Sequence, residues 1–141
     1  MPGYYEHAIK FFQWAKDAND KGDYFPVWGT CLGFETLHVI QGGERPEILS
    51  GGFSAEDITI PLEFVGNPRE SRLLKDMPDE LLKSLGEEPV TYNHHQAGVT
   101  PETYGKENSL DKFFQIISTN KDQDGRCFVS TVEGQWGLNN C

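Results

Sequence analysis

Two glycines flank a cysteine in the run Val27-Trp28-Gly29-Thr30-Cys31-Leu32-Gly33-Phe34-Glu35, and this spacing constrains the fold more than any other feature of the chain. The aromatic and apolar residues 24–28 before it favour a buried strand, and residues 34–40 after it favour a helix that ends at Gly42-Gly43. Glycines two positions before and after a central residue let a strand and a helix approach closely at a sharp turn. The run therefore predicts a nucleophile elbow with Cys31 at its tip.

A cysteine at such a turn would react as the thiolate, which the N-terminus of the following helix helps to stabilise. The alternative for the motif alone is a small buried cysteine in a glycine-rich turn, because cysteine is often simply buried. The neighbouring sequence has to decide between these two interpretations.

The rest of the chain alternates between helical and extended patterns. Apolar residues with helical spacing predict a first helix ended by Gly22, and Pro78 suits the first turn of a helix through Leu85 with Gly86 as its terminator. Residues 58–60 alternate like a strand, and Pro61 indicates either the end of this strand or a sheet edge. Residues 113–118 and 127–132 predict a hairpin. We therefore predict an α/β fold with one domain over residues 1–141, helices alternating with strands early and an antiparallel ribbon late. The apolar positions of the first helix are Tyr4, Ala8, Phe11, Ala15 and Ala18, and the inner face of the later helix is Leu81, Leu82 and Leu85.

Composition limits the partners. The 12 basic and 22 acidic residues give a net charge of −10, which argues against binding to nucleic acid or to an anionic membrane surface. No apolar run approaches the roughly 20 residues of a membrane span, and the first residues lack the pattern of a signal peptide. The three cysteines do not suggest a disulfide framework, although a bridge between Cys127 and Cys141 is possible.

No pattern predicts a metal or another cofactor. The adjacent His94 and His95 cannot easily supply one tetrahedral site, and the cysteines lack zinc-type spacing. Phosphate-loop and dinucleotide fingerprints are absent. Glu35 and Glu133 are single carboxylates without an evident partner, so a glycosidase pair is not indicated and Glu35 is interpreted as a structural residue of the elbow helix.

The residues around the elbow, 25–35, closely resemble the elbow of gamma-glutamyl hydrolases, the folate-polyglutamate hydrolases of the class I glutamine amidotransferase-like superfamily. The resemblance continues in the same order through later segments and spans roughly residues 3 to 136. It implies an incomplete three-layer class I glutamine amidotransferase-like fold. The later segments include 60–64, 78–85, 93–95, 112–114 and 130–134.

The resemblance also implies a chemistry and a set of partners. Cys31 would attack the γ-carboxamide of a folylpoly-γ-glutamate or antifolate polyglutamate, the backbone N–H of Leu32 would be one oxyanion donor, and a thioester would then be hydrolysed. Within the cleft, His95 matches the histidine of a family Asn-aromatic-His segment, and Arg72 could pair with a glutamate carboxylate; the alternatives are a polar loop histidine and a solvated arginine. A homodimer and a lysosomal or extracellular location are further implications.

The catalytic histidine and glutamate of the family are expected in a Trp-His-Pro-Glu segment, but here Trp136 is followed by Gly-Leu-Asn-Asn-Cys. His38 lies seven residues after Cys31, about 10 Å along a helix at 1.5 Å per residue, so direct pairing is not expected. We therefore expect a partial chain that also lacks N-terminal strands and has little or no turnover. The alternative to a hydrolase is an inactive truncated isoform or pseudoenzyme that keeps part of the cleft; an amidotransferase glutaminase would not explain the segments after residue 60.

Overall fold

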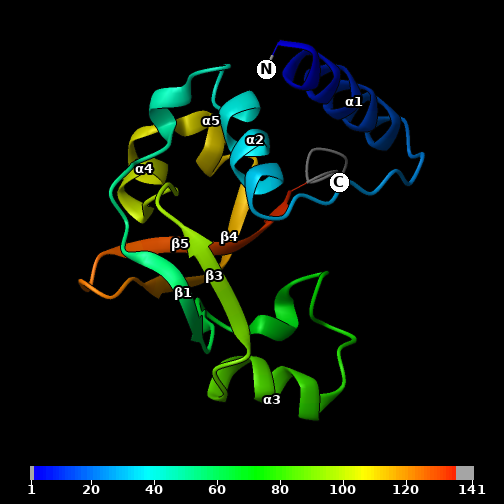
Figure 1. Ribbon diagram of the computed structural model, residues 1–141. Coiled ribbons are helices and arrows are strands. Elements are labelled where there is room, and N and C mark those ends of the chain that lie inside the picture. Colours follow the sequence, from blue (N-terminus) through cyan, green and yellow to red (C-terminus); the bar gives the residue numbers. More distant parts are fainter. Residues whose placement is uncertain (1, 136–141) are drawn as a thin grey trace.

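The computed structural model describes residues 2–135 (Figure 1). Within them, helices dominate the first third and strands the last. The α-helices are α1 (Pro2–Asp20), α2 (Leu32–Gln41), α3 (Asp79–Glu87), α4 (Pro101–Lys106) and α5 (Asn108–Asp111), and the 3-10 helices are η1 (Pro46–Ile48) and η2 (Pro68–Glu70). The strands are β1 (Ala55–Ile60), β2 (Glu63–Phe64), β3 (Thr91–His95), β4 (Phe114–Lys121) and β5 (Cys127–Gly134).

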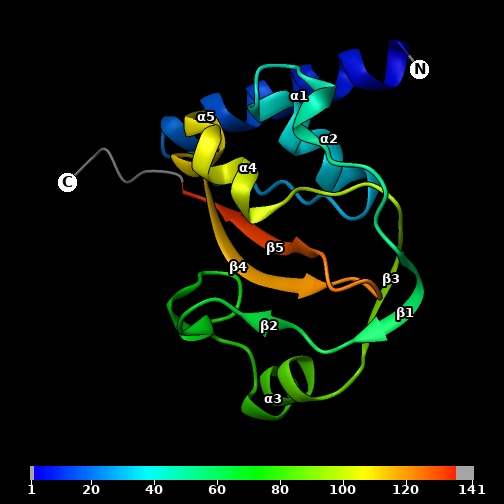
Figure 2. The same ribbon diagram turned by 90° about the vertical axis from the view of Figure 1, so that its left-hand side faces the viewer.

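The strands form two antiparallel sheets, one of order β2-β4-β5 and one that pairs β1 with β3. Helices α1, α2, α4 and α5 lie on one side of the β4–β5 hairpin, and α3 lies beyond β2 on the other side (Figures 1 and 2). This mixture of helices and sheets is compatible with the predicted α/β class. No helix within residues 2–135 is long and apolar enough to cross a membrane.

The main core fills the space between α2, α4, α5 and the hairpin. It is a cluster of buried side chains against which Phe34 and Leu37 of α2 pack, so the core fixes the helix that follows the elbow. A smaller cluster of Phe53, Ala55 and Phe128 joins β1 to β5. The main cluster consists of Ile48, Val99, Tyr104, Leu110, Phe114 and Val129.

The predicted hairpin is confirmed, with register pairs that include Phe114 with Gly134 and Lys121 with Cys127. Asp122 caps its turn, since the carboxylate accepts backbone N–H bonds from Ser54, Asp124 and Arg126 at 2.8–3.0 Å. Because Ser54 lies 68 residues away, the same carboxylate also anchors the start of β1 to the turn.

The predicted end of β1 before Pro61 is confirmed, but the details of two helices differ from the prediction. On α1, Phe12 and Ala15 are buried, whereas Tyr4 and Phe11 of the predicted apolar face are exposed. Gly86 lies inside α3 and does not end it. A Cβ at position 86 would lie 3.1 Å from the Phe64 ring, so this glycine permits close packing of α3 on β2.

The predicted strand 24–28 is wrong. Residues 23–30 have no regular secondary structure, and Tyr24 is 88% exposed. An isolated strand is not stable without neighbours to satisfy its backbone groups. Within residues 2–135 this segment is held instead by Asn19, whose side chain both donates to Phe25 O at 2.8 Å and accepts from Phe25 N at 3.1 Å. As a result α1 is followed directly by α2, and the expected early alternation of helix and strand is absent from this part of the chain.

Candidate active site at the elbow

Cys31 adopts a backbone conformation that few residues other than glycine adopt, with φ 55° and ψ −116° at the position that caps α2. Such a conformation costs about 1–3 kcal/mol and persists only where its surroundings impose it. Two backbone bonds do so here: Gly33 N donates to Thr30 O at 2.9 Å, and Glu35 N donates to Cys31 O at 3.1 Å. The predicted sharp turn into a helix is therefore present, although its first arm is an extended segment and not a strand.

The two glycines of the motif differ in the space that surrounds them. A Cβ at Gly29 would lie 2.7 Å from both the carbonyl carbon and the oxygen of Gly33, and 2.8 Å from Leu37 Cδ1. At Gly33 a Cβ would meet nothing within 4 Å among the described parts of the chain. Close approach of the two arms thus explains Gly29, and the structure gives no steric reason for Gly33.

The thiol of Cys31 is free and exposed, so the interpretation as a buried cysteine is wrong. Beside it, the N–H of Leu32 is the first of α2 and donates to no atom of residues 2–135. An unpaired N–H at a helix N-terminus is a ready donor to negative charge. The geometry thus places an exposed thiol next to an N–H that has no acceptor among residues 2–135, while the roles of Cys31 as nucleophile and of Leu32 N–H as oxyanion donor stay predictions.

His38 is a core residue, not a base for Cys31. It is fully buried; its Nδ1 donates to Phe34 O at 2.8 Å, and its Nε2 accepts from the Tyr104 hydroxyl at 2.5 Å. Its ring also stacks on Phe114, with 4.7 Å between the ring centroids. Burial lowers the pKa of His38 to about 4, so the ring is neutral near pH 7. His38 joins α2 to α4 and β4, and thereby holds the elbow helix in place.

Replacing Tyr104 by phenylalanine is expected to cost about 1–3 kcal/mol of unfolding free energy, because Nε2 of His38 would remain buried without a donor. Urea unfolding at pH 7 measures this cost. Tyr24→Phe is the matched control, since Tyr24 is exposed and exposed substitutions usually change stability by less than about 0.5 kcal/mol. Equal midpoints for the two variants would contradict the assigned hydrogen bond.

His95 and Glu35 lie near one another, one on β3 and the other on the first turn of α2. Burial raises the pKa of Glu35, and the charge of nearby His95 partly offsets this rise. The His95 ring contacts Ala97 O through Nδ1 at 2.8 Å and Asn93 Oδ1 through Nε2 at 3.3 Å, and it packs nearly perpendicular to the ring of Phe128. The substrate-facing role of His95 stays a prediction. Sequence reasoning missed its proximity to Glu35, since no local pattern links positions 35 and 95.

Arg72 is engaged at the end of β5. Its guanidinium donates to Gly134 O, and its backbone N–H donates to Glu133 Oε1 at 3.2 Å. Ser71 Oγ and Leu73 N donate to the other oxygen of Glu133, so this carboxylate ties residues 71–73 to β5. Within residues 2–135 no hydrogen bond or ion pair joins Arg72 to Cys31 or His95, and its pairing with a substrate carboxylate stays a prediction.

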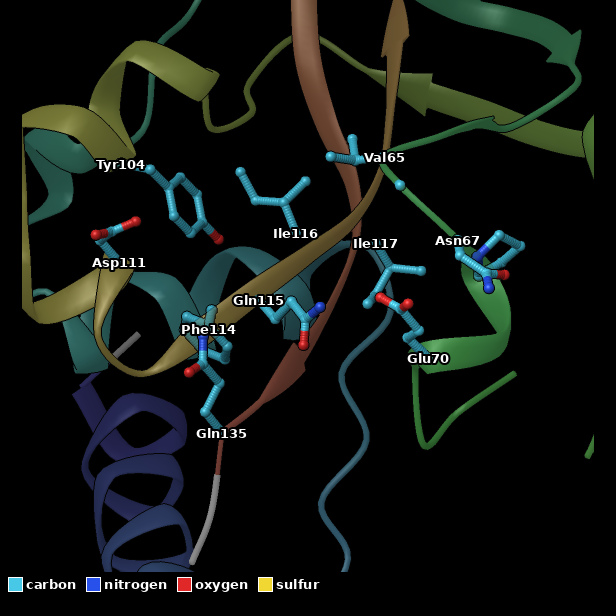
Figure 3. A pocket seen from close by; sticks show the side chains of 12 residues that line it. Val65, Asn67, Glu70, Tyr104, Asp111, Phe114, Gln115, Ile116, Ile117 and Gln135 are labelled. Atoms are coloured by element: carbon cyan, nitrogen blue, oxygen red, sulfur yellow. The ribbon is translucent and has the colours of Figure 1, made fainter. Parts of the chain in front are cut away.

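Two cavities flank these elements. One of about 360 Å³ lies between α1 and α2, and its lining includes Leu32, Glu35 and Tyr5. The other, of about 370 Å³, has Tyr104 and Asp111 on one side of β4 and Asn67 and Glu70 on the other (Figure 3). Neither lining contains Cys31 or a histidine.

No cluster of three or more histidine, cysteine or acidic residues within the described part of the chain is placed to hold a metal ion. Cys127 is free among the described residues. The possible partner Cys141, and the segment after Gln135 in which the family histidine is expected, lie outside the described residues.

The chain combines helices packed on antiparallel sheets, an arrangement compatible with the α/β class, with an exposed thiol at a strained turn before a helix. No protein-family model matches it. It is, however, related to gamma-glutamyl hydrolases, which confirms the resemblance expected from the sequence. It is 36% identical over 132 residues to gamma-glutamyl hydrolase B of Dictyostelium discoideum and 40% identical over 132 residues to the gamma-glutamyl hydrolase of Homo sapiens. These matches include 94% and 93% of this chain, which spans 38% and 40% of the length of the two relatives.

Proposed function

We propose that this chain forms the nucleophile-elbow part of a cysteine-dependent γ-glutamyl hydrolase with an incomplete three-layer class I glutamine amidotransferase-like fold. The observation that carries the proposal is the positive φ of Cys31 beside the Leu32 N–H, which donates to no atom of residues 2–135. Similarity to gamma-glutamyl hydrolases supports the proposal that a γ-glutamyl amide bond is the bond hydrolysed. Folylpoly-γ-glutamates or antifolate polyglutamates are the proposed substrates, and a homodimer and a lysosomal or extracellular location are proposed from the same similarity.

In the proposed reaction, the Cys31 thiolate attacks the γ-carboxamide carbon and the carbonyl oxygen becomes an oxyanion. Leu32 N–H donates to that oxygen, and one such donor is typically worth about 3 kcal/mol of the barrier. Collapse of the intermediate breaks the C–N bond, the amine leaves with a proton, and the acyl group remains on sulfur as a thioester. Water then hydrolyses the thioester and regenerates the thiol.

The amine needs a proton donor, and no histidine within residues 2–135 hydrogen-bonds to Cys31. His38 is engaged with Tyr104, His95 with Ala97, His94 with Asp57 and His7 with Gly3. This observation favours a second candidate function, that of a protein which retains part of the cleft without turnover. For the chain of 141 residues we expect little or no release of glutamate from a folylpolyglutamate, because loss of one triad member removes several orders of magnitude of rate.

A substrate whose leaving group needs no proton tests the elbow separately from that missing step. The γ-p-nitrophenyl ester of glutamate should acylate Cys31, with one p-nitrophenolate released per acyl group bound. Peptide mass spectrometry should locate the acyl group on Cys31, and the reaction should be lost in Cys31→Ala but kept in Cys127→Ala. The α-ester should react at least about tenfold more slowly, the discrimination expected of a few oriented contacts.

Two results would contradict the proposed function: equal acylation by the α- and γ-esters, or modification of Cys127 as fast as that of Cys31. Glutamate release from a folylpolyglutamate that is abolished by Cys31→Ala would instead support the hydrolase and exclude the candidate without turnover.

A further inference from the structure

The side chain of Trp28 reaches the residue that precedes the nucleophile. Its indole Nε1 donates to Thr30 Oγ1 at 2.7 Å. In an extended segment the side chains of residues i and i+2, here Trp28 and Thr30, point to the same face. A Cβ on Gly29 between them would instead point toward Gly33. Trp28 is 75% exposed, so this bond, and not burial in a core, accounts for the placement of its ring.

Thr30 is therefore held at two points. Trp28 binds its hydroxyl, and its carbonyl accepts the N–H of Gly33 at 2.9 Å. The peptide that leads into Cys31 cannot rotate without breaking one of these bonds. The backbone conformation of Cys31 is strained and persists only where its neighbours are fixed. The bonds that fix Thr30 therefore favour the elbow over relaxed conformations of Cys31.

We propose that Trp28 and Thr30 form a clip that positions Cys31 at the tip of the elbow. Both are positioning residues, since they act on the thiol through the backbone. Their catalytic role rests on the proposed function, whereas their effect on the elbow does not.

Hydrogen exchange at two amides tests the clip directly. The N–H groups of Gly33 and Glu35 close the elbow onto Thr30 O and Cys31 O, so an opened elbow exposes both. Trp28→Phe and Thr30→Val each remove only the clip, and each should accelerate exchange at both amides by about fivefold, equivalent to about 1 kcal/mol. Thr30→Ser keeps the hydroxyl, so exchange at the Gly33 and Glu35 amides should keep the wild-type rate. The double variant should exchange no faster than either single variant, because both lose the same bond.

Three controls make the result specific. The Leu82 amide, which donates to Pro78 O at the start of α3, should exchange at an unchanged rate in every variant. Trp14→Phe removes an exposed indole on α1 and should leave Gly33 and Glu35 unaffected. Alkylation of Cys31 by iodoacetamide, with Cys127 in the same sample as the reference, should keep nearly the wild-type rate in Trp28→Phe and Thr30→Val, because an open fraction about fivefold larger still leaves most molecules with a closed elbow.

The clip is overturned if Thr30→Ser behaves like Thr30→Val, if the effects of the two single variants add, or if Gly33 and Glu35 exchange at wild-type rates in both. None of these readouts needs turnover. If the γ-ester does not acylate Cys31 but exchange at Gly33 and Glu35 is accelerated in the clip variants, the proposed function is rejected and the clip stands. If the γ-ester acylates Cys31 but exchange is unchanged in the clip variants, the clip alone is rejected.

Discussion

Replacing Gly29 by alanine is expected to destabilise the elbow by about 3 kcal/mol, the upper end of the 1–3 kcal/mol that overpacking usually costs. The new Cβ would lie 2.7 Å from the carbonyl carbon and oxygen of Gly33. Backbone atoms at the start of a helix cannot rotate away as the end of a side chain can. The extended arm and α2 must therefore separate, and the strained conformation of Cys31 loses a constraint that maintains it.

The matched control is Gly33→Ala, in the same motif. A Cβ there meets nothing within 4 Å in the described part of the chain, and the position lies in α2. Alanine is favoured over glycine in a helix by about 0.5–1 kcal/mol, so this variant should be slightly stabilised. Urea unfolding and the rate of Cys31 alkylation measure both variants. A similar loss of stability in both variants would show that a general perturbation of the motif, and not the close approach at Gly29, dominates, because helix propensity favours alanine at position 33.

The elbow helix and the hairpin could be predicted because their signals are local. The glycines around Cys31 specify a turn within five residues, and the turn-rich residues 120–125 between two apolar runs specify a hairpin. Such patterns act before any long-range contact forms. The structure accordingly contains α2 and the β4–β5 pair where the sequence predicts them.

The strand predicted at 24–28 illustrates the limit of local patterns. Apolar and aromatic residues favour a strand only where a neighbouring strand completes the hydrogen bonds and covers the side chains. Within residues 2–135 no strand lies beside this segment, and Tyr24 and Trp28 remain exposed. The sequence shows that residues 24–28 are apolar and aromatic, but it does not show whether another strand lies beside them.

Long-range partners in the candidate site could not be predicted either. The sequence shows His38 seven residues after Cys31, but its bond to Tyr104 spans 66 residues and converts it into a core residue. Glu133 and Arg72 are likewise joined by a loop that folds onto the end of β5. Each of these pairings depends on tertiary packing, which no spacing within one segment encodes.

Acid is expected to weaken the fold through His38. Its pKa is about 4 in the folded protein against 6.5 for an unperturbed histidine, chiefly because of desolvation. Between these values the unfolded chain binds the proton and the folded chain does not, so unfolding free energy falls as pH falls. At 1.36 kcal/mol per pKa unit, this difference contributes about 3 kcal/mol to the unfolding free energy. The contribution is fully present above pH 6.5 and is lost by about pH 4.

His38→Gln isolates this contribution, because glutamine does not titrate and can still accept the Tyr104 hydroxyl. Its unfolding free energy should be lower than that of the wild type at pH 7, and the gap should narrow by about 3 kcal/mol toward pH 4. Carboxylates that titrate in the same range, including Glu35 with its raised pKa, affect both proteins and cancel in the difference. His94→Asn is the control, since His94 is exposed and lies outside the core.

A direct titration keeps this prediction testable even if His38→Gln fails to fold. In NMR spectra of the wild-type chain, the ring signals of His38 should not shift between pH 7 and pH 5, because protonation would place a charge between the Phe34 carbonyl and the Tyr104 hydroxyl in the core. The ring would also lose its capacity to accept the bond from Tyr104, so protonation and opening of α2 from α4 should occur together. A His38 titration near pH 6.5 in the folded chain would show that the ring reaches water, and that it does not hold the elbow helix as a neutral core residue.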